Sequence, residues 1–364
     1  MTTDTACLIG CGRIGHNHAE SYASTDGVEL TAIADINAER LAAMGELHDV
    51  PQGRRYRDYT ALLDAEDVDI ISVATPCSAH YNQVMTIATS ASEPAVIWCE
   101  KPIATTVREG QQMVAACEQS GAELVINHSR RFSYAYEALY DLLWDRQLLG
   151  DLRSVRLTAG PEFLNMGTHY LDLLLYLLDT TIDDVRGGCV EAVAVDETVR
   201  YSGGGILSMA NGVTGYLDPF GEAPKRLYIE GTKGRLSAPL SIAADVDQEW
   251  YYWQTGENGQ RPKTPPEPLT ELWDEDITGT PPTAGTAAVP AQPLFNNAAG
   301  HIVDLAAGNR ENAAPGTRAV HGLAGLVGLV VSEWTGSRIR LPLAHPFRGV
   351  PLSHEIPDDL QTEL

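Results

Sequence analysis

A glycine-rich motif at residues 10–15 constrains the fold of this chain more than any other feature. It follows a short apolar run and precedes a segment of helical composition at 13–24, so it joins a predicted strand to a predicted helix. The motif, which has the pattern G-x-G-x-x-G, consists of Gly10, Cys11, Gly12, Arg13, Ile14 and Gly15. Its first glycine permits a tight turn, its second lets the backbone approach a pyrophosphate, and its third allows close packing of helix on strand. The unpaired N–H groups of the helix N-terminus favour the same anion.

A carboxylate at the end of the second predicted strand makes this pattern more specific. Asp35 lies 20 residues after Gly15, where a carboxylate accepts hydrogen bonds from adenosine ribose hydroxyls. The same charge repels a 2′-phosphate, and the next residues, Ile36 and Asn37, provide no arginine to neutralise that phosphate. The sequence therefore predicts NAD as cofactor, with NADP disfavoured.

Apolar strands and helical segments alternate through the first part of the chain. Predicted strands at 29–35, 69–74, 95–100 and 123–127 are separated by helices at 38–46, 59–64, 78–88 and 107–120. This alternation predicts a Rossmann domain with a doubly wound parallel sheet. Beyond residue 127, consecutive segments of alternating character with glycine-rich turns predict an α+β domain with a large, mostly antiparallel open sheet.

The predicted fold class is therefore α/β, with two domains and a tail. We expect an NAD-binding domain over 1–126, a substrate-binding and oligomerisation domain over 127–344, and a C-terminal tail over 345–364. Residues 255–293 are rich in proline, glycine and threonine and have little periodicity, which predicts a long loop that could serve as a lid.

Composition narrows the class of partner. The formal net charge of -24 argues against nucleic acid and anionic membranes, because both require basic surfaces. No long uncharged apolar run and no secretory leader is found, so a cytoplasmic protein is expected. The six cysteines lack the close spacings of a metal site, and none is predicted. The excess of carboxylates over only four lysines fits either a halophilic source or a GC-rich genome.

Several further motifs occur in the order and spacing of the Gfo/Idh/MocA oxidoreductases, a family that the chain resembles. They are Ala74-Thr75-Pro76, Glu100-Lys101-Pro102, the segment from Asn165 through His169 to Asp172, and the late Arg340-Leu341-Pro342-Leu343. The resemblance implies that Ala74, Thr75, Pro76, His80 and Glu100 lie on the cofactor side of the site. For His80, a packing role remains an equal alternative.

The resemblance also implies catalytic roles for two residues. Lys101 would lie beside the nicotinamide, often after a cis peptide bond to proline in this family, and stabilise the charge that develops on the reacting oxygen. His169 would exchange the hydroxyl proton, since its ordinary pKa suits proton transfer near neutrality. Asp172, one helical turn later, would either orient His169 or only support the helix.

The chain departs from inositol dehydrogenase-like members at one position. Those members carry aspartate four residues before the histidine, whereas this chain has Asn165, which can bind a substrate hydroxyl but cannot act as a base. Three further residues, His128, Arg131 and Tyr136, resemble the substrate side of the family site. An arginine there could bind a carboxylate or phosphate of the substrate, or could pair with charges of an acidic protein.

Together, these features imply an NAD-dependent oxidoreductase that transfers a hydride between nicotinamide and a secondary or anomeric alcohol. The expected substrate is a sugar, nucleotide sugar, cyclitol or sugar acid, and the resemblance implies a homodimer or homotetramer. Two alternatives remain open: an NAD-using glycoside hydrolase of the same fold, and a non-catalytic NAD-binding regulator.

Overall fold

The computed structural model describes residues 3–158, 160, 162–195, 198–219, 225–240, 251–254 and 292–355. The chain divides into two compact units. The Rossmann unit comprises Met1–Phe132 and Ala291–Val320, and the second unit comprises Ser133–Pro290 and His321–Leu364. The boundaries predicted from sequence assign 291–320 to the second domain, whereas in the structure this segment clusters with the Rossmann unit. The predicted loop at 255–293 lies outside the described residues, except for Gln292 and Pro293, which begin a helix.

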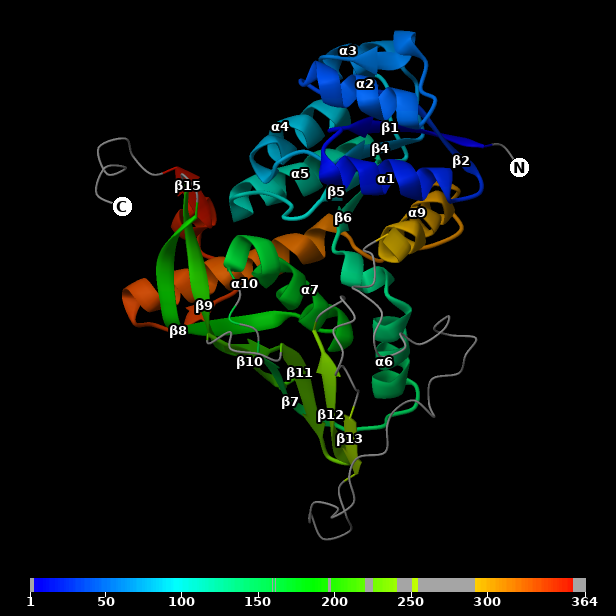
Figure 1. Cartoon of the computed structure of the whole chain (residues 1–364). Helices are drawn as coiled ribbons and strands as arrows, with labels where there is room; N and C mark the ends of the chain where they lie inside the picture. Colours follow the sequence, from blue (N-terminus) through cyan, green and yellow to red (C-terminus); the bar gives the residue numbers. More distant parts are fainter. Residues whose placement is uncertain are drawn as a thin grey trace. The chain divides into compact units, whose positions relative to one another are not determined.

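The Rossmann unit contains a six-stranded, fully parallel sheet in the order β3-β2-β1-β4-β5-β6 (Figure 1). Its strands are β1 (Asp4–Ile9), β2 (Val28–Ala34), β3 (Arg55–Tyr56), β4 (Ile70–Val73), β5 (Val96–Glu100) and β6 (Glu123–Asn127). Its helices are α1 (Arg13–Ala23), α2 (Ala38–Leu47), α3 (Tyr59–Ala65), α4 (Cys77–Ala88), α5 (Val107–Ser120) and α9 (Gln292–Ala306), with 3-10 turns η1 (Gln52–Arg54) and η2 (Ser129–Phe132). This topology confirms the predicted doubly wound sheet.

The central strands are mostly apolar because helices cover both faces of such a sheet. Every residue of β4 and β5 is buried. Helix boundaries follow local chemistry: the Asn37 side chain accepts hydrogen bonds from the first N–H groups of α2, and Thr106 and Glu109 form a capping box at α5. Sequence patterning therefore accounts for most elements of this unit.

Helix α9 completes the hydrophobic core of the Rossmann unit although it comes late in the chain. Phe295, Ala298 and Ile302 belong to one buried cluster with Tyr22 and Trp98. The rings of Trp98 and Phe295 lie 6.2 Å apart between centroids. This packing explains why residues 291–320 belong to the first unit.

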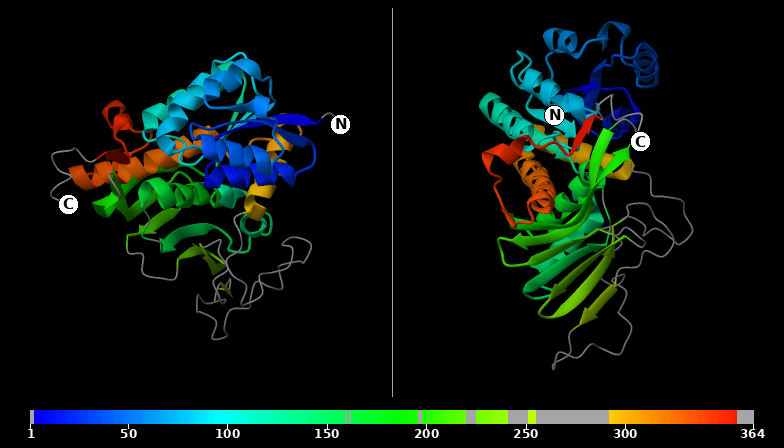
Figure 2. Two further views of the ribbon diagram at one scale, coloured as in Figure 1. Left: turned by 45° about the horizontal axis from the view of Figure 1, so that its top comes forward. Right: turned by 90° about the vertical axis from the view of Figure 1, so that its left-hand side faces the viewer.

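The second unit contains a mixed sheet in the order β13-β12-β11-β7-β10-β9-β8-β14, with β15 paired to β9 (Figure 2). Its strands are β7 (Leu152–Thr158), β8 (Ile182–Val195), β9 (Thr198–Met209), β10 (Thr214–Asp218), β11 (Arg226–Gly231), β12 (Gly234–Pro239), β13 (Tyr251–Gln254), β14 (Ile339–Arg340) and β15 (Ser353–Glu355). The β7–β10 pair is parallel, and the other pairings among described strands are antiparallel, as predicted. Its helices are α6 (Tyr134–Trp144), α7 (Thr168–Leu177) and the larger part of α10 (Gly316–Thr335), with turns η3 (Phe163–Gly167) and η5 (His345–Gly349).

Glycines on α10 let this helix approach its neighbours closely. A Cβ atom at Gly325 would lie 2.9 Å from side-chain atoms of both Leu171 on α7 and Ile182 on β8. A Cβ atom at Gly322 would make ordinary contacts of 3.7–3.9 Å with α7, and one at Gly328 would lie 2.8 Å from Val185 on β8. These glycines therefore allow α10 to pack closely on α7 and β8.

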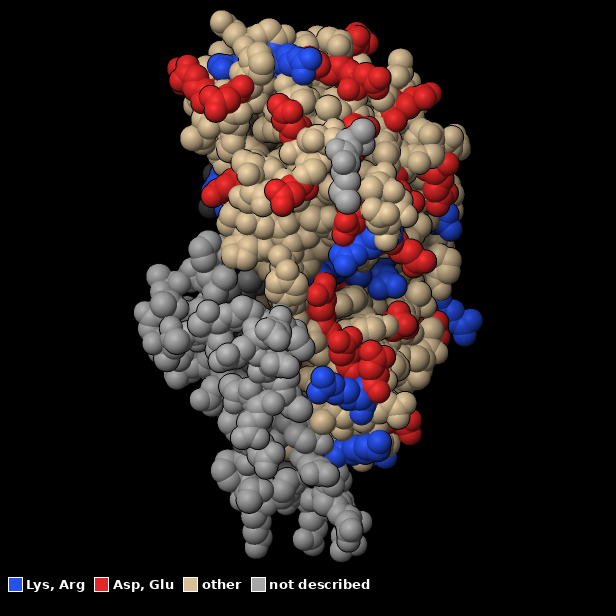
Figure 3. All heavy atoms as spheres, turned by 90° about the vertical axis from the view of Figure 1, so that its right-hand side faces the viewer, with Lys and Arg blue, Asp and Glu red and all other residues tan. Residues whose placement is uncertain are grey.

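On the opposite face of this sheet, side chains of β9 and β10 are partly exposed in the part of the chain that the structure describes. Along β9 and β10, Leu207 and Leu217 are buried, whereas Ile206 and Tyr216 are 43% and 42% exposed. This alternation is the pattern of a sheet covered on one side only. Asp and Glu side chains are spread among Lys and Arg on the surface drawn in Figure 3. No helix among the described residues is long and apolar enough to cross a membrane.

Candidate cofactor and substrate site

The predicted cofactor residues gather along one edge of the parallel sheet. Gly10 follows β1, Asp35 follows β2, Ala74 follows β4 and Lys101 follows β5. Since the strands are parallel, these positions share the carboxyl edge, where open α/β sheets bind their ligands. The backbone connects them, because Gly10 N donates to the Ala34 carbonyl and Ala74 N donates to the Ile9 carbonyl, each at 2.8 Å.

The glycines of the turn have different surroundings. Gly10 has a φ of +102°, and a Cβ there would lie 2.7 Å from the Ala74 carbonyl oxygen. A Cβ at Gly15 would lie 2.0 Å from the Gly10 carbonyl oxygen, so helix and turn are in direct contact. By contrast, a Cβ at Gly12 would meet nothing within 4 Å. Gly12 is also the N-cap of α1, and because it has no side chain it cannot cap the first N–H groups of the helix. Such a helix start suits the binding of an anion such as a pyrophosphate.

Asp35 holds the glycine turn in addition to its predicted role. Its Oδ2 accepts a hydrogen bond from Cys11 N, and its Oδ1 accepts one from Asn37 N, both at 2.7 Å. A carboxylate has about four lone-pair positions, so acceptor capacity remains for ribose hydroxyls. The side chain therefore couples the conformation of the glycine turn to the segment that follows β2.

Arg57 contacts the segment that follows Asp35, a contact that the sequence did not predict. Its guanidinium donates a hydrogen bond to the Ile36 carbonyl, although 21 residues separate the two positions. The pairing of Ala34 with Tyr56 brings the ends of β2 and β3 together. The residues directly after Asp35 include no arginine, and only the pairing of β2 with β3 brings Arg57 to this position.

The segment around Lys101 is fixed by a buried histidine. The Lys101–Pro102 peptide bond is cis, as the resemblance implied. His80 Nδ1 lies 2.8 Å from the Pro102 carbonyl oxygen and Nε2 lies 2.9 Å from the Thr75 carbonyl oxygen. Burial lowers the pKa of His80, while these two carbonyls and Glu100 act in the opposite direction. A neutral imidazole has one N–H, so it donates to one carbonyl at a time. His80 thus lies between the segments that follow β4 and β5.

Two residues predicted on the substrate side belong to the Rossmann unit. His128 and Arg131 are both buried, at the end of β6 and in η2. The Arg131 Nη1 donates to the Ala313 carbonyl at 2.9 Å, which ties this turn to the segment after α9. Arg131 therefore has a structural contact in addition to any role in binding.

The remaining predicted residues belong to the second unit. His169 and Asp172 are buried on α7, one turn apart. Asn165 lies just before them in η3, a π-type turn of the kind that often occurs at functional sites. The Glu162 carboxylate begins this turn by accepting hydrogen bonds from Leu164 N and Asn165 N, at 2.8 and 3.2 Å.

Tyr136 also belongs to the second unit. Its hydroxyl donates to the Pro239 carbonyl at 3.0 Å and its ring is buried. The structure thus groups the glycine motif, Asp35, His80, Lys101, His128 and Arg131 in one unit, and Asn165, His169, Asp172 and Tyr136 in the other.

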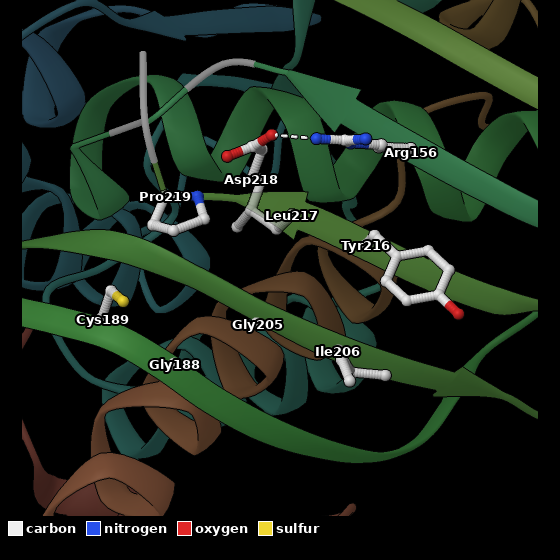
Figure 4. Close-up of a pocket in the computed structure, with 9 residues that line it drawn as sticks. All are labelled: Arg156, Gly188, Cys189, Gly205, Ile206, Tyr216, Leu217, Asp218 and Pro219. Atoms are coloured by element: carbon white, nitrogen blue, oxygen red, sulfur yellow. Dashed lines mark hydrogen bonds and ion pairs between the residues drawn. The ribbon is translucent and has the colours of Figure 1, made fainter.

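A hollow lies on the open face of the second sheet, with the helices behind it (Figure 4). It is lined by Arg156, Gly188, Cys189, Gly205, Ile206, Tyr216, Leu217, Asp218 and Pro219. Two of these residues, Arg156 and Asp218, form an ion pair at 2.6 Å. None of these residues was predicted as a site residue. Among the described residues, no group of three or more His, Cys, Asp or Glu is arranged to hold a metal ion.

The strand order and the glycine turn define a dinucleotide-binding protein, and comparison with known proteins gives its family. Residues 5–128 match the Gfo/Idh/MocA family model, described as an oxidoreductase family with an NAD-binding Rossmann fold. An inositol 2-dehydrogenase from Salmonella paratyphi B is 31% identical over 66% of this chain and 75% of its own length. The chain belongs to the Gfo/Idh/MocA family and is an oxidoreductase of that family.

Two other matches have names or bound ligands that point to other sugars. A D-apiose dehydrogenase from Paraburkholderia graminis is 36% identical over 58% of this chain, and the match spans 59% of that relative. The WlbA dehydrogenase from Bordetella pertussis, solved with NADH and UDP-GlcNAcA, shares the fold with a TM-score of 0.69. It is 22% identical, and the alignment covers 94% of this chain and all of the other.

Proposed function

We propose that this chain is an NAD-dependent dehydrogenase that acts on a hydroxyl-bearing carbon of a sugar, nucleotide sugar, cyclitol or sugar acid. The observation that supports this most is the arrangement of Gly12, Asp35 and Lys101 along one carboxyl edge of the parallel sheet. Relatives named for D-apiose and inositol support the polyol class of substrate.

The Rossmann unit holds the cofactor in this proposal. The N–H groups at the start of α1 bind the pyrophosphate, and Asp35 accepts hydrogen bonds from the adenosine ribose. NAD, when bound, supplies the hydride acceptor. Asp35 favours NAD over NADP, although Arg57 nearby reduces the electrostatic penalty for a 2′-phosphate.

The chain's own side chains supply acid–base and electrostatic catalysis. In the proposal, His169 takes the proton of the substrate hydroxyl and Lys101 donates a hydrogen bond to its oxygen. Asn165 positions a neighbouring hydroxyl, with His128 and Arg131 on the substrate side. The open sheet face with exposed Ile206 and Tyr216 is the surface on which a second copy of the chain would pack, giving a dimer or tetramer.

The test is to follow the absorbance of reduced nicotinamide with NAD and a panel of aldoses, sugar acids, nucleotide sugars and cyclitols. We expect NAD reduction with at least one member, and its loss in Lys101→Ala and His169→Ala variants that still bind NADH. Release of an aglycone without net reduction would instead identify a glycoside hydrolase. NAD binding without turnover across the panel would contradict the dehydrogenase assignment.

A further inference from the structure

The turn η3, which precedes α7, is organised around a single residue, Glu162. Four consecutive backbone N–H groups donate to it. Its carboxylate oxygens Oε1 and Oε2 accept from Leu164 N and Asn165 N at 2.8 and 3.2 Å. Its main-chain oxygen accepts from Met166 N and Gly167 N at 3.1 and 2.9 Å. Glu162 therefore satisfies N–H groups that the start of a helix otherwise leaves without a partner in the helix.

Glu162 is itself attached to β9, a strand of the same unit. A backbone bridge pairs Glu162 with Ser202. Arg200 Nη1 lies 3.6 Å from Glu162 Oε2, and Arg200 Nε donates to Thr198 Oγ1 at 3.2 Å, which orients the guanidinium. The turn is therefore tied through Glu162 to the sheet of its own unit.

The contacts of the Glu162 carboxylate differ in strength. The side chains of Arg200 and Glu162 are 29% and 22% exposed, and an ion pair between partly exposed groups contributes little because water and salt screen it. Hydrogen bonds from backbone N–H groups to a carboxylate are charge-assisted, which makes them shorter and stronger than neutral ones. We therefore expect the hydrogen bonds to Leu164 N and Asn165 N, rather than the ion pair, to hold the turn.

The turn is continuous with the residues predicted on the substrate side. Asn165 belongs to it, and α7, which carries His169, begins at the next residue, Thr168. Thr168 Oγ1 donates to the Asn165 carbonyl at 3.0 Å, so a hydrogen bond spans the junction of turn and helix. A change in the conformation of the turn would therefore displace Asn165 and the start of α7 together.

We propose that Glu162 is a positioning residue for the substrate side of the site, because its carboxylate fixes the turn that presents Asn165 and begins α7. The inference rests on the function proposed above, in which Asn165 binds a substrate hydroxyl and His169 takes a proton. Glutamate is not among the residues that most often begin a helix. Its longer side chain lets one carboxylate accept from the turn and also face Arg200. Glu162 acts only through the conformation of the turn.

Two substitutions separate this role from a general loss of stability. Glu162→Ala removes both side-chain hydrogen bonds and leaves those of the main chain. Glu162→Asp restores a carboxylate, and aspartate is favoured at the start of a helix, although it shortens the reach towards Arg200. Glu230→Ala is a matched control, because Glu230 is a partly exposed carboxylate of the same unit that pairs with Arg235 at 2.9 Å. Glu230 lies within β11, so it begins no turn.

The first readout is hydrogen–deuterium exchange, measured by mass spectrometry with fragmentation that resolves single amides. In Glu162→Ala we expect the amides of Leu164 and Asn165 to exchange at least about tenfold faster, since each loses a hydrogen bond to a charged group. Glu162→Asp and Glu230→Ala should exchange at rates close to those of the wild-type protein. This measurement needs neither substrate nor cofactor.

The second readout is steady-state kinetics with the substrate identified from the panel. We expect kcat/KM for that substrate to fall about tenfold to a hundredfold in Glu162→Ala, because small displacements of positioning groups cost rates of this size. NADH affinity and the KM for NAD should stay unchanged, since the Rossmann unit holds the cofactor in the proposed function. Glu162→Asp should recover most of kcat/KM. A general loss of stability would affect both ligands and would not be rescued in this way.

Unchanged exchange at both amides in a folded Glu162→Ala protein would overturn the proposal, and so would faster exchange combined with wild-type kcat/KM. If Glu162→Ala does not fold, Glu162→Gln provides the test, because its single acceptor oxygen can hold only one of the two N–H groups. Wild-type exchange and kcat/KM in that variant would have the same meaning. An Arg200→Met variant as impaired as Glu162→Ala would show that the ion pair holds the turn instead.

The two readouts also distinguish this proposal from the proposed function. A wild-type protein that turns over no member of the panel would count against the dehydrogenase assignment. The exchange comparison, which is independent of turnover, would still decide whether Glu162 fixes the turn.

Discussion

The two glycines at the start of α1 offer a sharp test, because the structure predicts that the same substitution lowers stability at one of them and not at the other. A Cβ at Gly15 would lie 2.0 Å from the Gly10 carbonyl oxygen, and such contacts are not found below about 3.0 Å. Turn and helix must therefore separate by about 1 Å. Because the contacted atom belongs to the backbone and not to a flexible side chain, the overpacking cost lies in the upper part of its usual range, at roughly 2–3 kcal/mol. Alanine returns about 1 kcal/mol through helix propensity. We expect Gly15→Ala to lower the free energy of unfolding by about 1–2 kcal/mol and to weaken NADH binding, since the turn itself moves.

Gly12→Ala should separate binding from stability. A Cβ there meets no protein atom within 4 Å, and φ and ψ of -80° and -171° suit alanine. The free energy of unfolding should thus change by less than about 1 kcal/mol. The new methyl group would lie where the pyrophosphate approaches, so NADH affinity should fall at least about tenfold, or 1.4 kcal/mol.

The assays are urea unfolding followed by tryptophan fluorescence and titration with NADH followed by fluorescence change. Gly53→Ala in η1 serves as the control, because a Cβ there also meets nothing within 4 Å and the site lies away from the glycine turn. It should change neither quantity. Wild-type NADH affinity in Gly12→Ala, or wild-type stability in Gly15→Ala, would refute this account of the turn.

Three further predictions follow from single side chains. Asp35→Ser should weaken NAD binding and raise the use of NADP, and the additional change Arg57→Ala should abolish that gain in steady-state assays; an equal gain in the double variant would exclude Arg57 from the site. His169→Asn should lower kcat with little change in NADH affinity, and an unchanged kcat would remove His169 from proton transfer. Burial, followed by the charge of Arg310, lowers the pKa of His301 to about 4, so folding favours its neutral form. The contribution of the neutral His301 to the free energy of unfolding is thus present above about pH 6.5 and lost as the pH falls towards 4. His301→Gln should reduce that loss of unfolding free energy by about 1–2 kcal/mol, as measured by urea unfolding at both ends of this pH range. A loss as large as that of the wild-type protein would contradict the prediction.

Most of the fold and of the candidate site that could be predicted from the sequence depends on local motifs. The glycine turn, Asp35 and Lys101 are each set by a few neighbouring residues after a buried strand, so their elements and their common edge follow from the pattern. Arg57 was missed because its position depends on the pairing of β2 with β3, which no local pattern records. Glu162 was missed for a different reason, because glutamate is not among the residues that usually begin helices.

The domain boundaries differ from the structure for a physical reason as well. The sequence at 295–307 predicts a helix, but it does not indicate which apolar surface that helix covers. In the structure α9 packs on Trp98 and Tyr22 of the Rossmann unit. Long-range packing of this kind is decided by complementary surfaces rather than by propensity.

The late arrival of α9 affects how the protein is made. During synthesis, Trp98 and its neighbours emerge from the ribosome almost 200 residues before Phe295, which covers them in the finished protein. The nascent nucleotide-binding half therefore presents uncovered aromatic surface until translation nears its end, and chaperones recognise surface of that kind. A gene fragment that stops at residue 132 would express a half with the same exposed patch, so attempts to transplant the cofactor module alone should include residues 291–320 on a linker.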